Sequence, residues 1–337
     1  MNITRYYHTA SILKNGMVLI SGRPFDDTLD ISTELYDPST GMWTNTGSMC
    51  SQRAHHKASV LTDGKVLVTG GLQGFDRLAS TELYDPSTGS WINTGNMITA
   101  RWQHTASTLE NGIALIAGGQ NVKPLVTSEL YNSSIGLWTK TGNMTIARHR
   151  HTASVLTNGK VLVAGGLDDK ILSSAELYDP STGLWTKTDS MNDARMWHTA
   201  SVLANGTVLV TGGKHPIGTL SSAELYDPST ESWIITGSMH DARIFHTASV
   251  LTNGKVLVVG GTNGHSLSSA ELYDPSTGLW TKTISLNTER QSHTASVLTN
   301  GKVLVVGGFD GLSEFNSAEL YDPSIEVCKD ASSKNTT

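Results

Sequence analysis

The chain has 337 residues, of which 38% are hydrophobic and 33 are glycine, and its formal net charge is −6 with a pI near 6.0. This charge balance excludes a general attraction to nucleic acid or to anionic membranes, and no apolar run approaches the roughly 20 residues of a membrane span. The composition favours a turn-rich all-β protein over a helical one.

The first predicted strand begins at His8 in the stretch HTASIL, and this stretch returns through the whole chain. Six copies read HTAS and one reads HKAS, at spacings of 47 or 48 residues. The copies begin at His8, His56, His104, His151, His198, His246 and His293. A period of this length is typical of propeller blades. The chain is therefore predicted to be one propeller domain, residues 1–331, followed by a polar tail, residues 332–337.

Each unit reads as four short strands, labelled a to d. Strand a, HTASVL, is followed in every copy by Asn-Gly or Asp-Gly, from Asn15-Gly16 to Asn300-Gly301, which is the strongest short hairpin signal. Strand b is KVLVVGG, strand c is AELYDP before a DPSTG turn, and strand d is LWTKTG. Small residues such as Ala10 suit an innermost strand, and large pairs such as Tyr36 and Trp43 are expected to fill the space between blades.

The Gly-Gly doublet after a hydrophobic strand, then Tyr, then Trp, is similar to the kelch repeat. The whole chain resembles a seven-bladed kelch β-propeller of the galactose oxidase central-domain type, which implies an all-β fold with four antiparallel strands per blade. Two units depart from the pattern: unit one has Ser21-Gly22 in place of Gly-Gly, and unit seven has Cys328 in place of Trp.

The ends of the chain bear on how the ring closes. The stretch from Met1 to Arg5 aligns with the d–a connection from Met97 to Arg101. Strand d of unit seven is therefore expected from about Glu326 to Ala331, with no strand exchanged from the N-terminus. Cys328 supplies less apolar surface than an indole, so the seventh blade is expected to be weak.

Polar residues present once per unit are interpreted first as parts of the frame. The histidines of HTAS are expected to pack or hydrogen bond at the start of strand a rather than to bind metal. An Arg stands three residues before each His, and a Glu stands before each Leu-Tyr. These two could form an internal ion pair, or the arginines could form a ring of guanidinium groups around the channel mouth.

The resemblance favours the second interpretation of the arginines. In relatives that capture acidic peptide segments, arginines at this place in the repeat belong to the binding surface. The resemblance therefore adds seven arginines to the candidate binding residues: Arg5, Arg53, Arg101, Arg148, Arg195, Arg243 and Arg290.

Sequence variation distinguishes the two faces of the predicted disc. The a–b and c–d turns are nearly identical in all units, whereas the b–c loops and the residue pair between Arg and His differ in every unit. Variable loops on a rigid frame usually carry recognition, although such pairs could also vary because they pack loosely between blades. The candidates from these pairs are Tyr6, Tyr7, His55, Trp102, His149, Arg150, Met196, Trp197 and Phe245.

Three functions compete. The favoured one is a noncatalytic, monomeric, cofactor-free propeller that binds a protein or peptide, with an acidic segment as one option. The second is an extracellular carbohydrate- or surface-binding propeller, suggested by five N-x-S/T sequons, at Asn2, Asn132, Asn143, Asn205 and Asn335. The third is a copper oxidase, since galactose oxidases use this propeller with copper, two His, two Tyr and a Tyr–Cys cross-link. Here the cysteines, Cys50 and Cys328, fall at outer positions, which argues against that chemistry.

The expected location follows from the cysteines and from the N-terminus. Two cysteines form neither a disulfide framework nor a zinc spacing, and the opening residues lack an apolar signal-peptide core. A cytoplasmic location is expected, or an extracellular one if the chain is part of a longer secreted protein.

Overall fold

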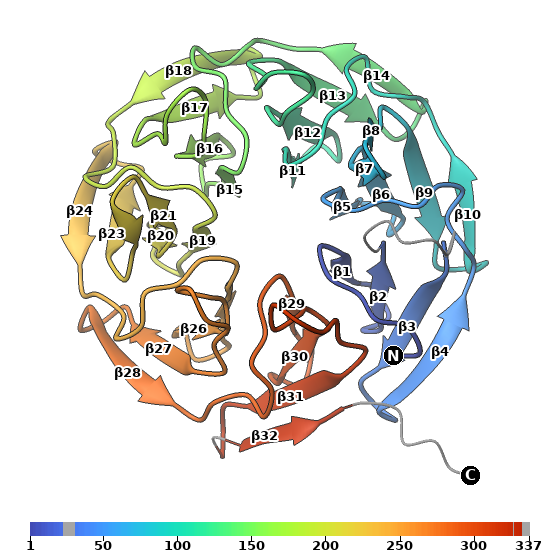
Figure 1. Ribbon diagram of the computed structural model, residues 1–337. Helices are drawn as coiled ribbons and strands as arrows, with labels where there is room; N and C mark the ends of the chain where they lie inside the picture. Colours follow the sequence, from blue (N-terminus) through green and yellow to red (C-terminus); the bar gives the residue numbers. More distant parts are fainter. Residues whose placement is uncertain (23–30, 326, 332–337) are drawn as a thin grey trace.

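A computed structural model describes residues 1–22, 31–325 and 327–331. The b–c loop of unit one, Glu326 and the polar tail lie outside the described residues. Within them all regular secondary structure is β, and seven four-stranded antiparallel sheets stand as blades around one axis (Figure 1). The seven-bladed propeller predicted from the repeat is confirmed.

The two inner strands of each blade carry the small and the aliphatic residues. The innermost strands are β1 (Thr9–Ile12), β5 (Lys57–Val60), β11 (Thr105–Thr108), β15 (Thr152–Val155), β19 (Thr199–Val202), β25 (Thr247–Val250) and β29 (Thr294–Val297). The second strands are β2 (Val18–Ser21), β6 (Val66–Thr69), β12 (Ala114–Ala117), β16 (Val161–Ala164), β20 (Val208–Thr211), β26 (Val256–Val259) and β30 (Val303–Val306). The second strands are buried along their whole length because both their faces pack against neighbouring blades.

The two outer strands carry the aromatic pair in blades one to six, and in blade seven Cys328 lies opposite Tyr321. The third strands are β3 (Thr33–Asp37), β9 (Thr81–Asp85), β13 (Ser128–Asn132), β17 (Ala175–Asp179), β23 (Ala223–Asp227), β27 (Ala270–Asp274) and β31 (Ala318–Asp322). The fourth are β4 (Met42–Thr46), β10 (Ser90–Asn93), β14 (Leu137–Lys140), β18 (Leu184–Thr188), β24 (Ser232–Thr236), β28 (Leu279–Thr283) and β32 (Val327–Asp330). Two b–c loops add short hairpins, β7 (Leu72–Gln73) with β8 (Asp76–Arg77), and β21 (Lys214–His215) with β22 (Gly218–Thr219).

The aromatic pair joins each blade to the one before it. Tyr36 and Trp43 lie opposite each other on β3 and β4, with ring centroids 5.0 Å apart. The Trp43 indole N–H donates to the carbonyl of Ala331 in blade seven, at 2.9 Å. In blade two the Tyr84 hydroxyl lies 2.8 Å from Thr46 Oγ1 of blade one. These bonds place the rings between blades, as expected for an apolar body with a polar tip.

Close backbone approach explains the glycine doublets. Gly118 has a φ of +60°, and a side chain there would meet the Arg148 carbonyl oxygen at 2.5 Å. In unit one the strand register corrects the sequence alignment, because Thr9 pairs with Ser21 as Lys57 pairs with Thr69. Gly22 therefore stands at the first glycine of the doublet, and Ser21 is the last residue of β2.

The ring closes as predicted, within blade seven itself. Its sheet has the order β29-β30-β31-β32, and Cys328 takes the place of Trp opposite Tyr321. The N-terminal segment joins this blade to blade one through the backbone, since the Arg5 N–H donates to the Phe315 carbonyl at 3.1 Å. Figure 1 shows the first and last blades side by side.

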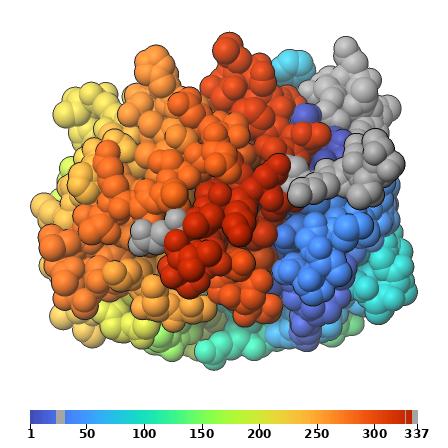
Figure 2. Space-filling model, turned by 90° about the horizontal axis from the view of Figure 1, so that it is seen from below, coloured from blue at the N-terminus to red at the C-terminus, as the bar shows by residue number. Residues whose placement is uncertain are grey.

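The disc has two different faces. The b–c loops and d–a connections form the face called the loop face, and the short a–b and c–d turns form the opposite turn face. Seen from the side, several segments project from one face while the other is flatter (Figure 2). No helix in the described part of the chain is long and apolar enough to cross a membrane.

The seventh blade is expected to open first. Cys328 packs at the edge of the cluster of Leu286 and Tyr321, where the other blades place an indole. Losing most of an indole's contacts costs about 2–4 kcal/mol. Hydrogen exchange should therefore be fastest in β31, β32 and their contacts with blades six and one, and Cys328→Trp should slow it. Equal protection in all seven blades would contradict this expectation.

Candidate functional site

On the loop face, the d–a connection pairs with the b–c loop of the blade that it enters in blades two to seven. The first residue of the variable pair forms a backbone bridge to the residue that follows the glycine doublet. The bridges join Ala54 to Leu72, Trp102 to Gln120, His149 to Leu167, Met196 to Lys214, Ile244 to Thr262 and Gln291 to Phe309. The two variable segments of these six blades are thus fixed to each other by main-chain contacts and need no particular side chains.

The second residue of each variable pair has a left-handed backbone, although none of the seven is glycine. Their φ values lie between 52° and 57°. These residues are Tyr7, His55, Gln103, Arg150, Trp197, Phe245 and Ser292, and together they are called the annulus. A positive φ is uncommon for any non-glycine residue and persists only where the surroundings impose it.

Backbone hydrogen bonds around the axis supply that constraint. The His55 N–H donates to the Tyr7 carbonyl at 3.2 Å, and the Gln103 N–H donates to the His55 carbonyl at 3.3 Å. The same bond recurs at the N–H groups of Arg150, Trp197 and Ser292, and the Tyr7 N–H donates to the Ser292 carbonyl at 3.3 Å. The main chain of the annulus is therefore held independently of its side chains, which are free to differ.

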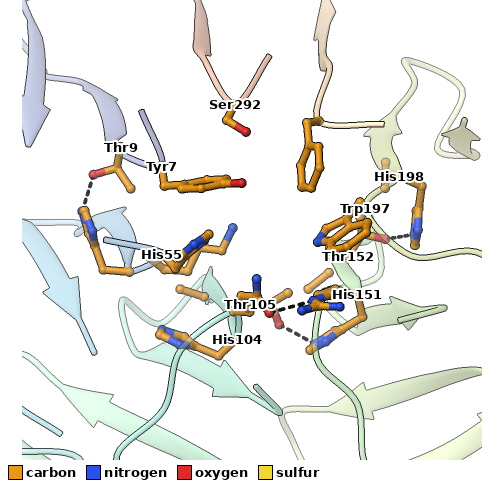
Figure 3. Close-up of a pocket in the computed structure, with 18 of the residues that line it drawn as sticks. Tyr7, Thr9, His55, His104, Thr105, His151, Thr152, Trp197, His198 and Ser292 are labelled. Atoms are coloured by element: carbon orange, nitrogen blue, oxygen red, sulfur yellow. Dashed lines mark hydrogen bonds between the residues drawn. The ribbon is translucent and has the colours of Figure 1, made fainter. Parts of the chain in front are cut away.

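The annulus side chains line a cavity of about 410 Å³ on the axis. Tyr7 and Trp197 point into it from opposite sides (Figure 3). The rings of Tyr7 and His55 lie 3.8 Å apart, and those of Trp197 and Phe245 lie 4.7 Å apart. The Arg150 guanidinium stacks on Trp197, 4.4 Å from the ring centroid. The part of the cavity wall that the annulus forms is therefore largely aromatic, and the Arg150 guanidinium is a cation among the rings.

Below the annulus, the repeated histidines form a second ring that also lines the cavity. Each His Nε2 contacts a Thr hydroxyl of the preceding blade: His198 meets Thr152 at 2.9 Å and His151 meets Thr105 at 3.1 Å (Figure 3). The contact between His8 and Thr294, at 2.9 Å, joins blade one to blade seven in the same way. Blade two departs from the pattern because Lys57 replaces Thr, and His104 meets Thr69 instead, also at 2.9 Å. These contacts confirm a structural role for the histidines.

The histidine ring is electrically neutral. Burial, reinforced by a nearby Arg, lowers the pKa of His8, His198 and His293 to about 3. The same causes hold the pKa of the other four well below 6.5. Cavity walls made of neutral imidazoles and hydroxyls offer hydrogen bonds but no charge.

The seven arginines do not form a ring at the channel mouth, and the structure corrects that hypothesis. All are fully buried, and each contacts the Glu of strand c in its own blade, at N···O distances between 2.5 and 3.4 Å. Arg5, Arg53, Arg101, Arg148, Arg195, Arg243 and Arg290 therefore leave the candidate binding surface. The internal Arg–Glu pair considered from the sequence is the arrangement found.

One blade shows what each arginine does. The Arg101 guanidinium donates to the carbonyls of Gly118 and Thr127, at 2.6 and 2.9 Å, and to Glu129 at 2.6 Å. Glu129 also accepts the backbone N–H groups of Ile98 and Thr99. The pair therefore joins strand c, the b–c loop and the d–a connection in one buried network.

The two residues of a variable pair have different surroundings: the second lines the cavity, and the first packs against the protein outside it. Of the predicted residues, Tyr7, His55, Arg150, Trp197 and Phe245 line the cavity. Tyr6, Trp102, His149 and Met196 are first members of their pairs and do not line it. Instead Tyr6 packs on Phe309, Trp102 packs on His55, and His149 and Met196 are buried.

Among the cavity residues that were not predicted as site residues are three at positions that differ between units. Gln103 and Ser292 are small or uncharged members of the annulus and line the cavity with the rest. Lys57 lines it from strand a. The signal that could have found Lys57 is the HKAS copy itself, where one repeat departs from six identical ones.

The cavity does not resemble a metal centre. Among residues 1–22, 31–325 and 327–331, no group of three or more His, Cys, Asp or Glu is placed to hold a metal ion. The Nε2 atoms of the repeated histidines are already engaged by threonine hydroxyls. These side chains do not fit a copper site.

Comparison with known proteins agrees with the architecture. A family model described as the KLHDC2/KLHL20/DRC7 Kelch-repeats domain matches residues 7–213 and again 103–308, and a Kelch motif model matches residues 292–335. One similar solved structure is a novel fungal alcohol oxidase with catalytic diversity among the AA5 family, in complex with copper. It is 21% identical with a TM-score of 0.74, over 91% of this chain and 71% of the oxidase chain, which shows a shared fold. No curated protein matches the sequence.

Breaking one Arg–Glu pair should destabilise the fold. Arg101→Met leaves the buried Glu129 carboxylate without its counter-charge, which is expected to lower the free energy of unfolding by about 3–5 kcal/mol. The double variant Arg101→Met, Glu129→Gln should recover part of that loss. Urea denaturation measures both effects, and a loss below about 1 kcal/mol in the single variant would show that the pair is not structural.

Acid should destabilise the protein before its carboxylates titrate. The histidines protonate near pH 6.5 when unfolded, but far lower when folded. Unfolding therefore takes up protons below that pH, and the free energy of unfolding falls from about pH 6.5 towards 4 by up to ~1.4 kcal/mol per pH unit for each histidine. Urea denaturation between pH 7.5 and 5 tests this, and a flat profile would contradict a neutral ring.

Proposed function

The chain belongs to the family of Kelch-repeat proteins, and on that premise we propose that it is a noncatalytic interaction propeller. A protein or peptide partner binds on the loop face, over the annulus. The observation that carries the proposal is the annulus itself: seven chemically different side chains, presented on one repeated backbone, around one cavity. A fixed frame with variable side chains is the usual arrangement of a recognition surface.

The repeated residues support this by being fully used elsewhere. The arginines and glutamates are paired with each other, the histidines with threonines, and the tyrosines and tryptophans lie between blades. These arginines, glutamates, tyrosines and tryptophans do not line the cavity, and the histidines line it below the annulus with their Nε2 atoms already bonded to threonines. What differs from unit to unit is concentrated on the loop face, so the proposal places binding there.

The tips of the b–c loops add exposed apolar surface to the same face. Four tips carry a large apolar residue that is almost fully exposed, and together these residues are called the crown: Phe75 (95%), Val122 (79%), Ile217 (92%) and Leu312 (96%). Side chains this exposed on projecting loops form no part of the core. Apolar groups at the rim of a concave site are typical of surfaces that are covered by a partner.

The chemistry of the annulus suits such a contact. Trp, Tyr, Phe and Arg are enriched among the side chains that dominate binding energy at protein interfaces, and Trp197, Tyr7, Phe245 and Arg150 stand together around the cavity. With the repeated arginines buried, an acidic segment of the partner would meet Arg150 instead.

Replacing the aromatic wall should remove binding while leaving the fold intact. Trp197→Ala and Phe245→Ala truncate half-buried side chains whose backbone positions are held by main-chain bonds. Each is expected to cost about 2 kcal/mol or more in binding, roughly thirtyfold in affinity. Affinity capture with a mass readout, followed by titration of the captured partner, measures the loss.

Two control variants make the test specific. Leu184→Ala removes a residue that is 60% exposed on the outermost strand β18, away from the loop face, and should leave capture unchanged. Trp102→Ala removes a ring that lies outside the cavity lining and should reduce stability more than binding. Equal capture by all four variants, with intact folding, would move the binding surface to the turn face or the outer strands.

A further inference from the structure

The cavity breaks the symmetry of the repeat at one place. Six units have Thr at the first position of strand a, and unit two has Lys57. Lys57 lines the same cavity as the annulus. Its ammonium group makes no hydrogen bond or ion pair with the described residues, so a cation stands in the axial cavity with no counter-charge from them.

The surroundings show where the Lys57 ammonium acts. Burial is the main cause of the lowered pKa of His55 on the annulus and of His104 and His151 in the ring below, and the charge of Lys57 lowers these values further. The Lys57 side chain is exposed to solvent within the channel, but the protein around it lowers its own pKa by desolvation. An unpaired ammonium in such surroundings is stabilised by an incoming anion.

Arg150 supplies a second cation to the same space. Its Nε donates to Gln103 Oε1 at 2.9 Å, and its guanidinium plane is held against Trp197. Its Nη1 meets only the Met196 sulfur, at 3.9 Å, among the described residues. The terminal N–H groups are therefore pre-positioned and open to a carboxylate, for which a planar guanidinium is well suited.

None of the described residues that line the cavity is acidic. A concave site with charge of one sign and low-polarity walls concentrates ions of the opposite sign. One part of the wall consists of ring faces, from His55 through Tyr7, whose ring centroid lies 6.3 Å from that of Phe245, to Trp197. Flat apolar groups pack well against such faces.

From this combination we propose that the axial cavity is a binding site for a small aromatic carboxylic acid. The carboxylate pairs with Lys57 and Arg150, and the ring packs against Trp197, Phe245 and Tyr7. The cavity volume of about 410 Å³ lies in the range of small-molecule sites, roughly 300–1,000 Å³. The acid site shares the side chains of Trp197, Phe245, Tyr7 and Arg150 with the proposed partner surface, whereas Lys57, which lies on strand a, belongs to the acid site alone.

The test is calorimetric titration of the purified protein with 1-naphthoate and benzoate. At least one of the two acids should bind at a single site with a Kd of about 1 mM or tighter. The uncharged 1-naphthamide and benzamide should bind at least about tenfold more weakly, because they forgo the charge-assisted hydrogen bonds.

Substitutions test whether Lys57 and Arg150 form the acid-binding site. Lys57→Thr restores the residue of the six other units, so it should fold, and it should weaken acid binding at least about tenfold. Arg150→Gln should do the same. Lys123→Thr removes an exposed loop-face cation outside the cavity and should leave acid binding unchanged.

The outcomes separate this site from the proposed function. If the Lys57→Thr variant loses acid binding but still captures the protein partner, then acid binding is distinct from partner binding. The inference is overturned if neither acid saturates, if the amides bind as well as the acids, or if both cavity variants bind normally. It is also overturned if only an acidic peptide enters the cavity, an outcome that would leave the protein-binding proposal standing.

Discussion

The buried Arg–Glu pair is the interaction on which the rest of this molecule depends. In every blade the arginine comes from the d–a connection, and its guanidinium gathers two carbonyls of the b–c segment and the carboxylate of strand c. Neither charge can be left alone in this environment without a large penalty. The chain entering each blade must therefore fold back onto that blade at one fixed point, and the residues just after the arginine are carried to the axis.

That fixed point explains why the annulus can vary. The two residues between Arg and His must span from the buried network to strand a, and the second of them adopts a left-handed backbone in all seven units. The strain is held by backbone bonds to the neighbouring blade, which are indifferent to side-chain identity. Sequence is thus free where it faces the cavity and constrained everywhere around it, which is the physical basis for placing recognition on this face.

The sequence predicted the architecture because its signals are local and are repeated in every blade. The strand spacing, the Asn-Gly turns, the Tyr–Trp pairs and the closure of blade seven all follow from patterns within one unit. Whether the arginines are paired or exposed could not be predicted from such local patterns, because the glutamate that each one contacts lies about 28 residues further along the chain, on strand c. The resemblance to peptide-binding relatives favoured the ring at the mouth, and burial excludes it.

Only part of the cavity lining was predicted from the sequence, and the reason is geometric. Alternation along an extended segment sends neighbouring side chains to opposite sides, so only one residue of each variable pair could face the axis. The sequence does not say which one, because the deciding left-handed turn occurs at Tyr, His, Gln and Arg rather than at glycine. Lys57 was not predicted as a site residue, although its copy of the repeat places a lysine in the axial cavity where six units have threonine.

The most direct measurement of the central claim is the backbone footprint of a bound partner. Hydrogen exchange of the complex, compared with the free chain, should show new protection at the b–c loops and the annulus and none at the a–b and c–d turns. Protection concentrated on the turns or on the outermost strands would contradict the assignment of the loop face as the binding surface.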